Sequence, residues 1–142
     1  MYKRVLIALD GSAPSFRAVS AAAKMSASIE EITLINVVTI QHVFSADGQS
    51  VEFFPSEYYQ ELMQNAHEVL DKAEAMLDKH PRVTKIVESG PPAEIILQLA
   101  DKDHYDLIIV GSRGLNTLER LFLGSVGHKV VSLANSPVML VK

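Results

Sequence analysis

The chain has 142 residues, of which 48% are hydrophobic and 21% charged, so its composition is that of one globular domain spanning residues 1–142 and excludes a disordered chain. Its formal net charge of −4 argues against a nucleic-acid partner, because binding to a polyanion requires a basic face. The sequence contains no cysteine, which excludes disulfides and thiolate metal sites.

Short apolar runs alternate along the chain with longer segments of helical periodicity. The runs are predicted strands, and the second, fourth and fifth are nearly continuous, as expected for strands covered on both faces of a parallel sheet. The predicted strands are Arg4 to Leu9, Ile32 to Val38, Val83 to Glu88, Asp106 to Val110 and Pro137 to Val141.

Four helices are predicted between these strands. Ser12 is a good N-cap for the first helix, which tolerates Pro14 in its first turn. Pro81 ends the second helix, because proline cannot continue the hydrogen-bond ladder. The predicted helices begin at Ser12, run from about Ser56 to His80, begin at Pro91, and run from about Val126 to Ala134.

The alternation of strands and helices predicts an α/β fold, a doubly wound open sheet with right-handed crossovers and helices on both faces. Residues 39–55 show no clear period, and we expect a long surface loop there. The short apolar run after Met1 does not suit a signal peptide, and no segment approaches the length of a membrane span. We therefore expect a cytoplasmic protein without a membrane partner.

Two glycine-containing segments follow the fourth predicted strand: Gly111-Ser112-Arg113-Gly114 and Gly124-Ser125-Val126-Gly127. Ligands of such sheets bind outside the carboxyl ends of the strands, where the strand order reverses. The second segment opens a helix, and we expect its backbone N–H groups, beginning with that of Gly124, to bind phosphate. Asp10, at the end of the first strand, is placed to accept from a ribose hydroxyl or to hold Mg²⁺ through water. Single glycines at such points are usually turn residues, but two pairs at one edge of a sheet predict a nucleotide site.

The spacing Gly111-x2-Gly114-x9-Gly124-Ser125 resembles the glycine motif of the ATP-binding branch of the universal stress protein family. The segments Val5 to Ser12, Asp106 to Gly111 and Ser136 to Val141 are similar to the same family, so the resemblance covers the whole chain outside the 39–55 loop. It implies five parallel strands in the order 3-2-1-4-5, as in the adenine-nucleotide α-hydrolase-like fold. The motif is not a P-loop, since no Gly-Lys-Ser/Thr follows the glycines.

The resemblance also implies that the residues at the ends of the first and second strands border adenine and ribose. Those after the fourth strand would wrap the ribose and phosphates, and those at the start of the fourth helix would hold the phosphate chain of ATP with its Mg²⁺. The implied ligand contacts are Ala8, Leu9, Asp10, Val37, Val110, Gly111, Arg113, Gly114, Gly124, Ser125 and Val126. The sequence identifies no catalytic residue.

The favoured hypothesis is therefore a nucleotide-sensing regulatory module of the stress response, with at most slow ATP hydrolysis and a regulatory protein partner. The last predicted strand, Pro137 to Val141, is an apolar edge, and the family resemblance implies a homodimer paired through it. Two alternatives remain open: a slow ATPase or nucleotidyl-transferring enzyme, and a structural dimer of the same fold that binds no nucleotide.

Overall fold

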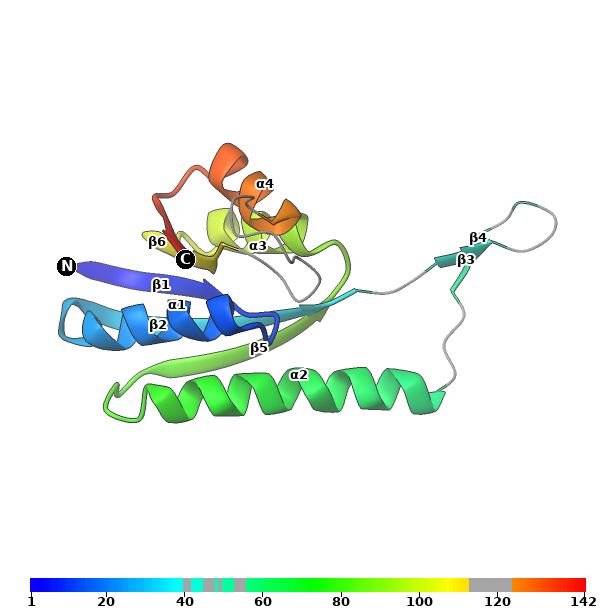
Figure 1. The fold of residues 1–142 in the computed structure, drawn as a ribbon. Helices are drawn as coiled ribbons and strands as arrows, with labels where there is room; N and C mark the ends of the chain where they lie inside the picture. Colours follow the sequence, from blue (N-terminus) through cyan, green and yellow to red (C-terminus); the bar gives the residue numbers. More distant parts are fainter. Residues whose placement is uncertain (40–41, 45–47, 49, 53–55, 113–123) are drawn as a thin grey trace.

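The computed structural model describes residues 1–39, 42–44, 48, 50–52, 56–112 and 124–142 (Figure 1). Within them, β1 (Tyr2–Ala8), β2 (Ile29–Val38), β5 (Val83–Ser89), β6 (Leu107–Gly111) and β7 (Val138–Val141) form one parallel sheet. The strands lie in the order β5-β2-β1-β6-β7, which is 3-2-1-4-5 when the five are numbered along the chain. The predicted fold class and strand order are confirmed.

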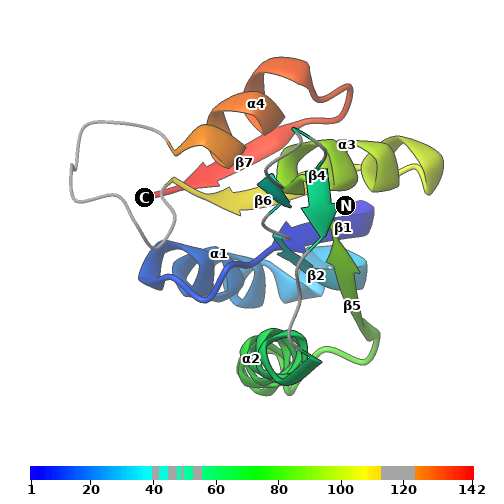
Figure 2. The same ribbon diagram turned by 90° about the vertical axis from the view of Figure 1, so that its right-hand side faces the viewer.

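Helices cover both faces of this sheet. Figure 2 shows α1 (Ala13–Lys24) and α2 (Ser56–Met76) on one side, and α3 (Pro92–Lys102) and α4 (Ser125–Leu133) on the other. The side on which each helix lies follows from right-handed crossovers, because the chain moves from β1 toward β5 in its first half and then toward β7. None of the described helices combines the length and apolar character that crossing a bilayer requires.

The core consists of two apolar clusters, one on each face of the sheet. On β1, Val5 and Ile7 pack with residues of α1 and α2, whereas Leu6 packs with residues of α3 and α4. All three side chains are fully buried. Burial on both faces removes the polar alternation of a half-exposed strand, which is why the runs in the sequence are continuously apolar.

Helix α2 ends earlier than expected, at Met76 instead of His80. The four following residues form turns, in which the His80 N–H donates to the Leu77 carbonyl oxygen at 2.8 Å. The buried His80 ring then ties this turn to the sheet, since its Nε2 lies 2.9 Å from the Ile29 carbonyl oxygen. Its Nδ1 accepts the N–H of Arg82 at 3.2 Å.

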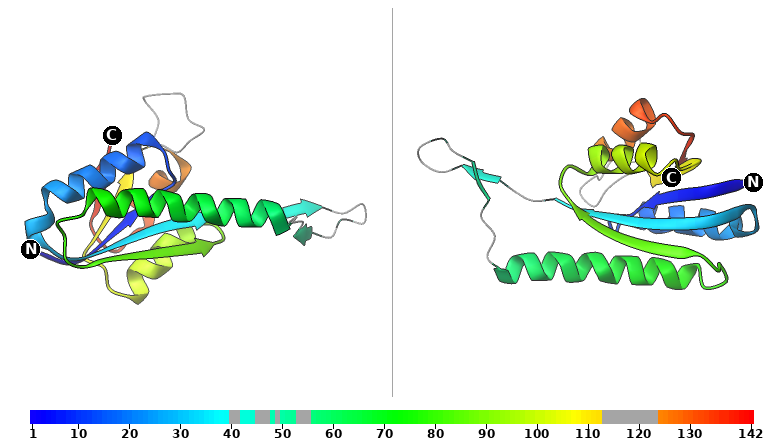
Figure 3. Two further views of the ribbon diagram at one scale, coloured as in Figure 1. Left: turned by 90° about the horizontal axis from the view of Figure 1, so that it is seen from below. Right: turned by 180° about the vertical axis from the view of Figure 1, so that it is seen from behind.

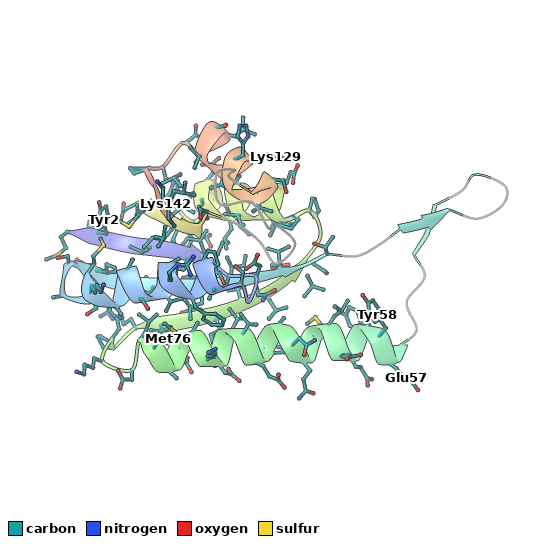
Figure 4. The ribbon with its side chains drawn as sticks, in the orientation of Figure 1. Tyr2, Glu57, Tyr58, Met76, Lys129 and Lys142 are labelled. Atoms are coloured by element: carbon teal, nitrogen blue, oxygen red, sulfur yellow. The ribbon has the colours of Figure 1, made fainter. Side chains whose placement is uncertain are left out.

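The segment expected as a long loop contains a small antiparallel hairpin, β3 (His42–Phe44) paired with β4 (Ser50–Glu52). Three-residue strands are too short to show a period in the sequence, which explains why they were not predicted. Figures 1 and 3 show that the hairpin stands away from the sheet. Glu57 and Tyr58 lie at the end of α2 that is nearest the hairpin (Figure 4), and the side chain of Tyr58 is 47% exposed.

Candidate functional site

The carboxyl ends of β1 and β6 lie side by side at the centre of the sheet. Ala8, the last residue of β1, pairs with Val110 of β6 and with Ile35 of β2. Helix α1, which follows β1, lies on one face of the sheet, and α4, which follows β6, lies on the other. The strand order reverses between β1 and β6, so their carboxyl ends are where the fold predicts a ligand to bind, and we call this edge of the sheet the predicted crevice.

The turn after β1 presents one carboxylate. Asp10 is exposed, and its Oδ1 accepts the N–H of Ser12 at 2.9 Å. Gly11 has a φ of +86°, a conformation that favours glycine, and it lets the chain turn tightly into α1. The side chain of Ser12 then caps α1 by accepting the Ser15 N–H at 3.3 Å, as predicted. The Asp10 carboxylate therefore lies at the predicted crevice, where the Ser12 N–H orients it.

Four of the predicted residues share one apolar cluster, on the α3 and α4 face of the sheet. Ala8, Val37 and Val126 are partly buried members of this cluster, and Val110 is a buried one at 3% exposure. They come from the ends of three strands and from the first turn of α4. Together they offer an apolar wall, with Val110 supporting it from within the core.

Leu9 belongs to the opposite face. It is 4% exposed and packs in the cluster formed with α1 and α2, while its N–H donates to the Ile35 carbonyl oxygen at 2.9 Å. Its side chain is therefore a core side chain, and only its backbone borders the crevice.

Gly111 is packed against α1. A Cβ built on Gly111 would lie 2.7 Å from the backbone carbonyl carbon of Pro14 and 2.8 Å from the backbone nitrogen of Ser15. Real Cβ atoms essentially never approach other atoms this closely, so only glycine fits without displacing α1. The family resemblance implies that Gly111 contacts the ligand, and the structure gives it a packing function that the sequence does not indicate.

The second glycine segment corrects one expectation. The N–H of Gly124 donates to the carbonyl oxygen of Ser112 at 2.8 Å and is not available to a phosphate. Gly124 is the N-cap of α4, and its carbonyl oxygen accepts the first bond within the helix from His128 at 2.9 Å. The N–H groups that lack an acceptor within the helix therefore begin at Ser125, which is exposed, and Val126.

Arg113 and Gly114 lie outside the described residues, so the positions predicted for them stay predictions. Among the residues that the structure describes, no group of three or more acidic or histidine side chains is arranged to hold a metal. A nucleotide-bound Mg²⁺ does not need such a group, because it is usually held by phosphate oxygens, water and one or two carboxylates. The donor at this crevice, the exposed carboxylate of Asp10, fits that requirement.

Comparison with known proteins identifies the family. The family model described as "Universal stress protein family" matches residues 1–142. The chain belongs to the universal stress protein family. A universal stress protein of Thermus aquaticus is 39% identical over 143 residues, and the match covers 100% of both chains. Universal stress protein YxiE of Bacillus subtilis is 30% identical over 148 residues, again with 100% of both covered.

Solved structures of this universal stress protein's relatives share its fold. The structure of protein MJ0577 of Methanocaldococcus jannaschii matches with a TM-score of 0.82 at 30% identity, covering 100% of this chain and 96% of that one. Universal stress protein UspA of Lactobacillus plantarum matches with a TM-score of 0.84 at 20% identity, over 99% of this chain and 98% of that one. The second likeness concerns the fold alone.

Two contacts beside the predicted crevice of this universal stress protein were missed by sequence reasoning. At the carboxyl end of β7, the Val141 carbonyl oxygen accepts the N–H of Ser112 at 2.8 Å. Arg17 of α1 donates from Nε to the Lys142 carbonyl oxygen at 2.8 Å. No sequence motif marks either contact, because each joins segments that are distant in the chain and meet only in the folded sheet.

Proposed function

We propose that this universal stress protein binds adenine nucleotides, with ATP and its Mg²⁺ as the resident ligand, as a single-domain regulatory module of the stress response. The observation that carries the proposal is that three kinds of group lie at the carboxyl ends of β1 and β2 and at the start of α4. An apolar wall of Ala8, Val37 and Val126 suits an adenine ring. The carboxylate of Asp10 suits a ribose hydroxyl or a hydrated cation, and the first-turn amides of α4 suit phosphate oxygens.

Relatives of the same fold support this ligand class. A universal stress protein structure in complex with cAMP matches with a TM-score of 0.67 at 24% identity. One from Archaeoglobus fulgidus in complex with dAMP matches with a TM-score of 0.68 at 20% identity. Adenine is common to both ligands, whereas their phosphate groups differ. The base is therefore the part of the ligand that these relatives support, and ATP is our choice for this chain.

Calorimetric titration of the nucleotide-free protein with ATP, ADP, AMP and GTP tests the proposal. We expect ATP to bind in the micromolar range and GTP at least about tenfold more weakly, a difference of about 1.4 kcal/mol. Absence of binding for all four nucleotides would leave the alternative of a structural dimer without a ligand. Absorbance of the purified protein near 260 nm provides an independent check for a ligand retained through purification.

Hydrolysis distinguishes a regulatory module from an enzyme. Phosphoryl transfer depends on positioned charge at the γ-phosphate and on an oriented nucleophile, and the sequence identifies no side chain in either function. We expect turnover of Mg-ATP on the order of one per minute or less, far below typical enzymes. Several turnovers per second, abolished by Asp10→Ala, would instead support the ATPase or nucleotidyl-transfer alternative.

We also propose that the protein is a cytoplasmic homodimer paired through β7, and that a regulatory protein recognises its nucleotide state. Support for the dimer is the edge position of β7: within the described residues it pairs with β6 on one side and with no strand on the other, and it carries the 36% exposed side chain of Leu140. An apolar strand edge of this kind is an aggregation hazard unless it is covered.

A further inference from the structure

The backbone of Ser112 joins the last strand to the start of α4. Its N–H donates to the Val141 carbonyl oxygen at 2.8 Å, and its carbonyl oxygen accepts the Gly124 N–H at 2.8 Å. Ser112 is only 8% exposed, so its polar backbone groups depend on these partners. A buried N–H or carbonyl group that loses its partner is costly, and therefore Ser112 is held where β7 and α4 meet.

The carboxyl end of β7 is held in turn by α1. Arg17 Nε donates to the Lys142 carbonyl oxygen at 2.8 Å, and α1 contacts both β6 and β7. Lys142, labelled in Figure 4, directly follows Val141, the last residue of β7. Both residues of this pair are exposed, so their bond alone contributes modestly. Its importance lies in its place, since it restrains the residue next to Val141.

We propose that the carboxyl end of β7, held by Arg17, positions the N-terminus of α4 for the phosphates of the nucleotide. This inference rests on the proposed function and deepens it. Arg17 is a positioning residue, because its hydrogen bond is to Lys142 and it acts on the phosphate site only through β7 and Ser112. The Gly124 N–H donates to the Ser112 carbonyl oxygen. This hydrogen bond fixes the position of the N–H groups of Ser125 and Val126, which would face the phosphates.

The proposal predicts a selective effect on phosphate binding. Adenine is expected to contact the ends of β1 and β2, at Ala8 and Val37, and neither of these strands pairs with β7. Loosening β7 should therefore weaken a ligand with a phosphate chain more than it weakens adenosine. A residue with a general structural function would weaken both equally.

The test compares ATP and adenosine by calorimetry in two variants. For a variant that lacks Val141 and Lys142, we expect ATP affinity to fall about tenfold and adenosine affinity to change less than about twofold. For Arg17→Gln we expect about a threefold loss for ATP, with recovery in Arg17→Lys, which keeps the charge and a donor. The matched control is Arg82→Gln, the same change on an exposed arginine at the amino end of β5, which should leave both affinities unchanged.

Amide hydrogen exchange gives a readout that does not depend on any ligand. In the shortened variant, the Gly124 amide should exchange at least about tenfold faster than in the parent, because Ser112 loses its support. Unchanged Gly124 exchange, or equal losses for ATP and adenosine, would overturn the inference. If the parent binds no nucleotide, the proposed function fails, and the Gly124 exchange rate still decides whether β7 positions α4. If the shortened variant does not fold, the same comparison in Arg17→Gln decides.

Discussion

The α-carbon of Gly111 faces the backbone of Pro14 so closely that a Cβ added to Gly111 would lie 2.7 Å from the Pro14 carbonyl carbon and 2.9 Å from its oxygen. The neighbouring atoms are backbone atoms of a helix and cannot rotate away as a flexible side chain would. The end of β6 and the first turn of α1 are thereby held in contact, and both border the crevice.

Gly111→Ala is expected to destabilise the protein by about 1–3 kcal/mol, the usual range for forcing an extra carbon into a packed site. Urea unfolding followed by circular dichroism measures the change. Gly48→Ala is a useful comparison, because a Cβ at Gly48 would meet no atom within 4 Å, although its φ of +80° adds some backbone strain. A change below about 0.5 kcal/mol for Gly111→Ala would contradict the packing function.

Gly124→Val is expected to abolish ATP binding while the fold is kept. Gly124 has φ −61° and ψ 157°, an extended conformation that any residue adopts, so valine causes no backbone strain there. Its branched side chain would stand beside the free amides of α4 and compete with the phosphates for space. Titration with ATP measures the loss of binding, and a melting curve checks that the fold is kept. Binding within about threefold of the parent, less than 1 kcal/mol, would show that the phosphate site is elsewhere.

Tyr105→Phe should lower the free energy of unfolding by about 1 kcal/mol. The Tyr105 hydroxyl donates to Thr33 Oγ1 at 2.9 Å, and the two residues are 4% and 5% exposed. The variant keeps the aromatic ring, whose centroid lies 4.7 Å from the Arg4 guanidinium carbon. The loss of unfolding free energy therefore measures the hydrogen bond between the two hydroxyl groups. Thr33→Val in the same protein completes a double-mutant cycle. Additive effects of the two substitutions would contradict a direct interaction between the hydroxyls.

The ion pairs of Lys85 with α2 predict a defined pH dependence. Lys85 Nζ lies 2.8 Å from Asp71 Oδ1 and 3.1 Å from Glu74 Oε1. The hydrogen bond from Lys85 holds the pKa of Asp71 below its ordinary value of 3.8, and its bond to Asp71 raises the pKa of Lys85 above 10.5. The stabilisation is therefore present between these two values. It is lost as the pH falls through the lowered pKa of Asp71 or rises through the raised pKa of Lys85.

Lys85→Met should accordingly lower the urea midpoint slightly at pH 7, with a smaller effect in high salt, because the carboxylate partners are exposed. The difference between parent and variant should shrink on acidification through the pKa of Asp71. Lys129→Met removes a comparable exposed pair, with Glu94 at 3.1 Å on the other face, and serves as the control for losing one charge. A difference that stays constant down to about pH 2 would contradict the assignment.

Leu140→Lys is expected to convert a dimer into a monomer at micromolar concentration. Leu140 is 36% exposed on the edge strand β7, and a charge there would be buried without a partner if two copies paired. Light scattering coupled to size exclusion measures the mass. Tyr58→Lys, at the exposed start of α2, should leave the mass unchanged. A monomeric parent protein at the same concentration would contradict pairing through β7.

Local signals in the sequence were sufficient for most of the fold. Five apolar runs, the N-cap Ser12 and the end of the second helix near Pro81 predict the elements that the structure contains. The topological rule predicts a ligand crevice at the ends of β1 and β6, and this site stays a prediction. The small β3–β4 hairpin escaped, because three-residue strands leave no period. The predicted end of the second helix, His80, is four residues too late, because α2 ends at Met76 and residues 77–80 form a turn.

The sequence by itself determined the fold class and the alternation of strands and helices, because both depend on hydrophobic periodicity and on contacts between residues close in the chain. The glycine spacing is read directly from the sequence. Only the tertiary structure decided that the Gly124 N–H bonds to Ser112, that Gly111 fits against the backbone of Pro14, and that Val141 supports Ser112. Each of these relationships joins elements that meet through the strand order and register of the sheet. The register determines where the Gly124 N–H points and how much space lies beside the Gly111 α-carbon. Composition and periodicity carry no information about either.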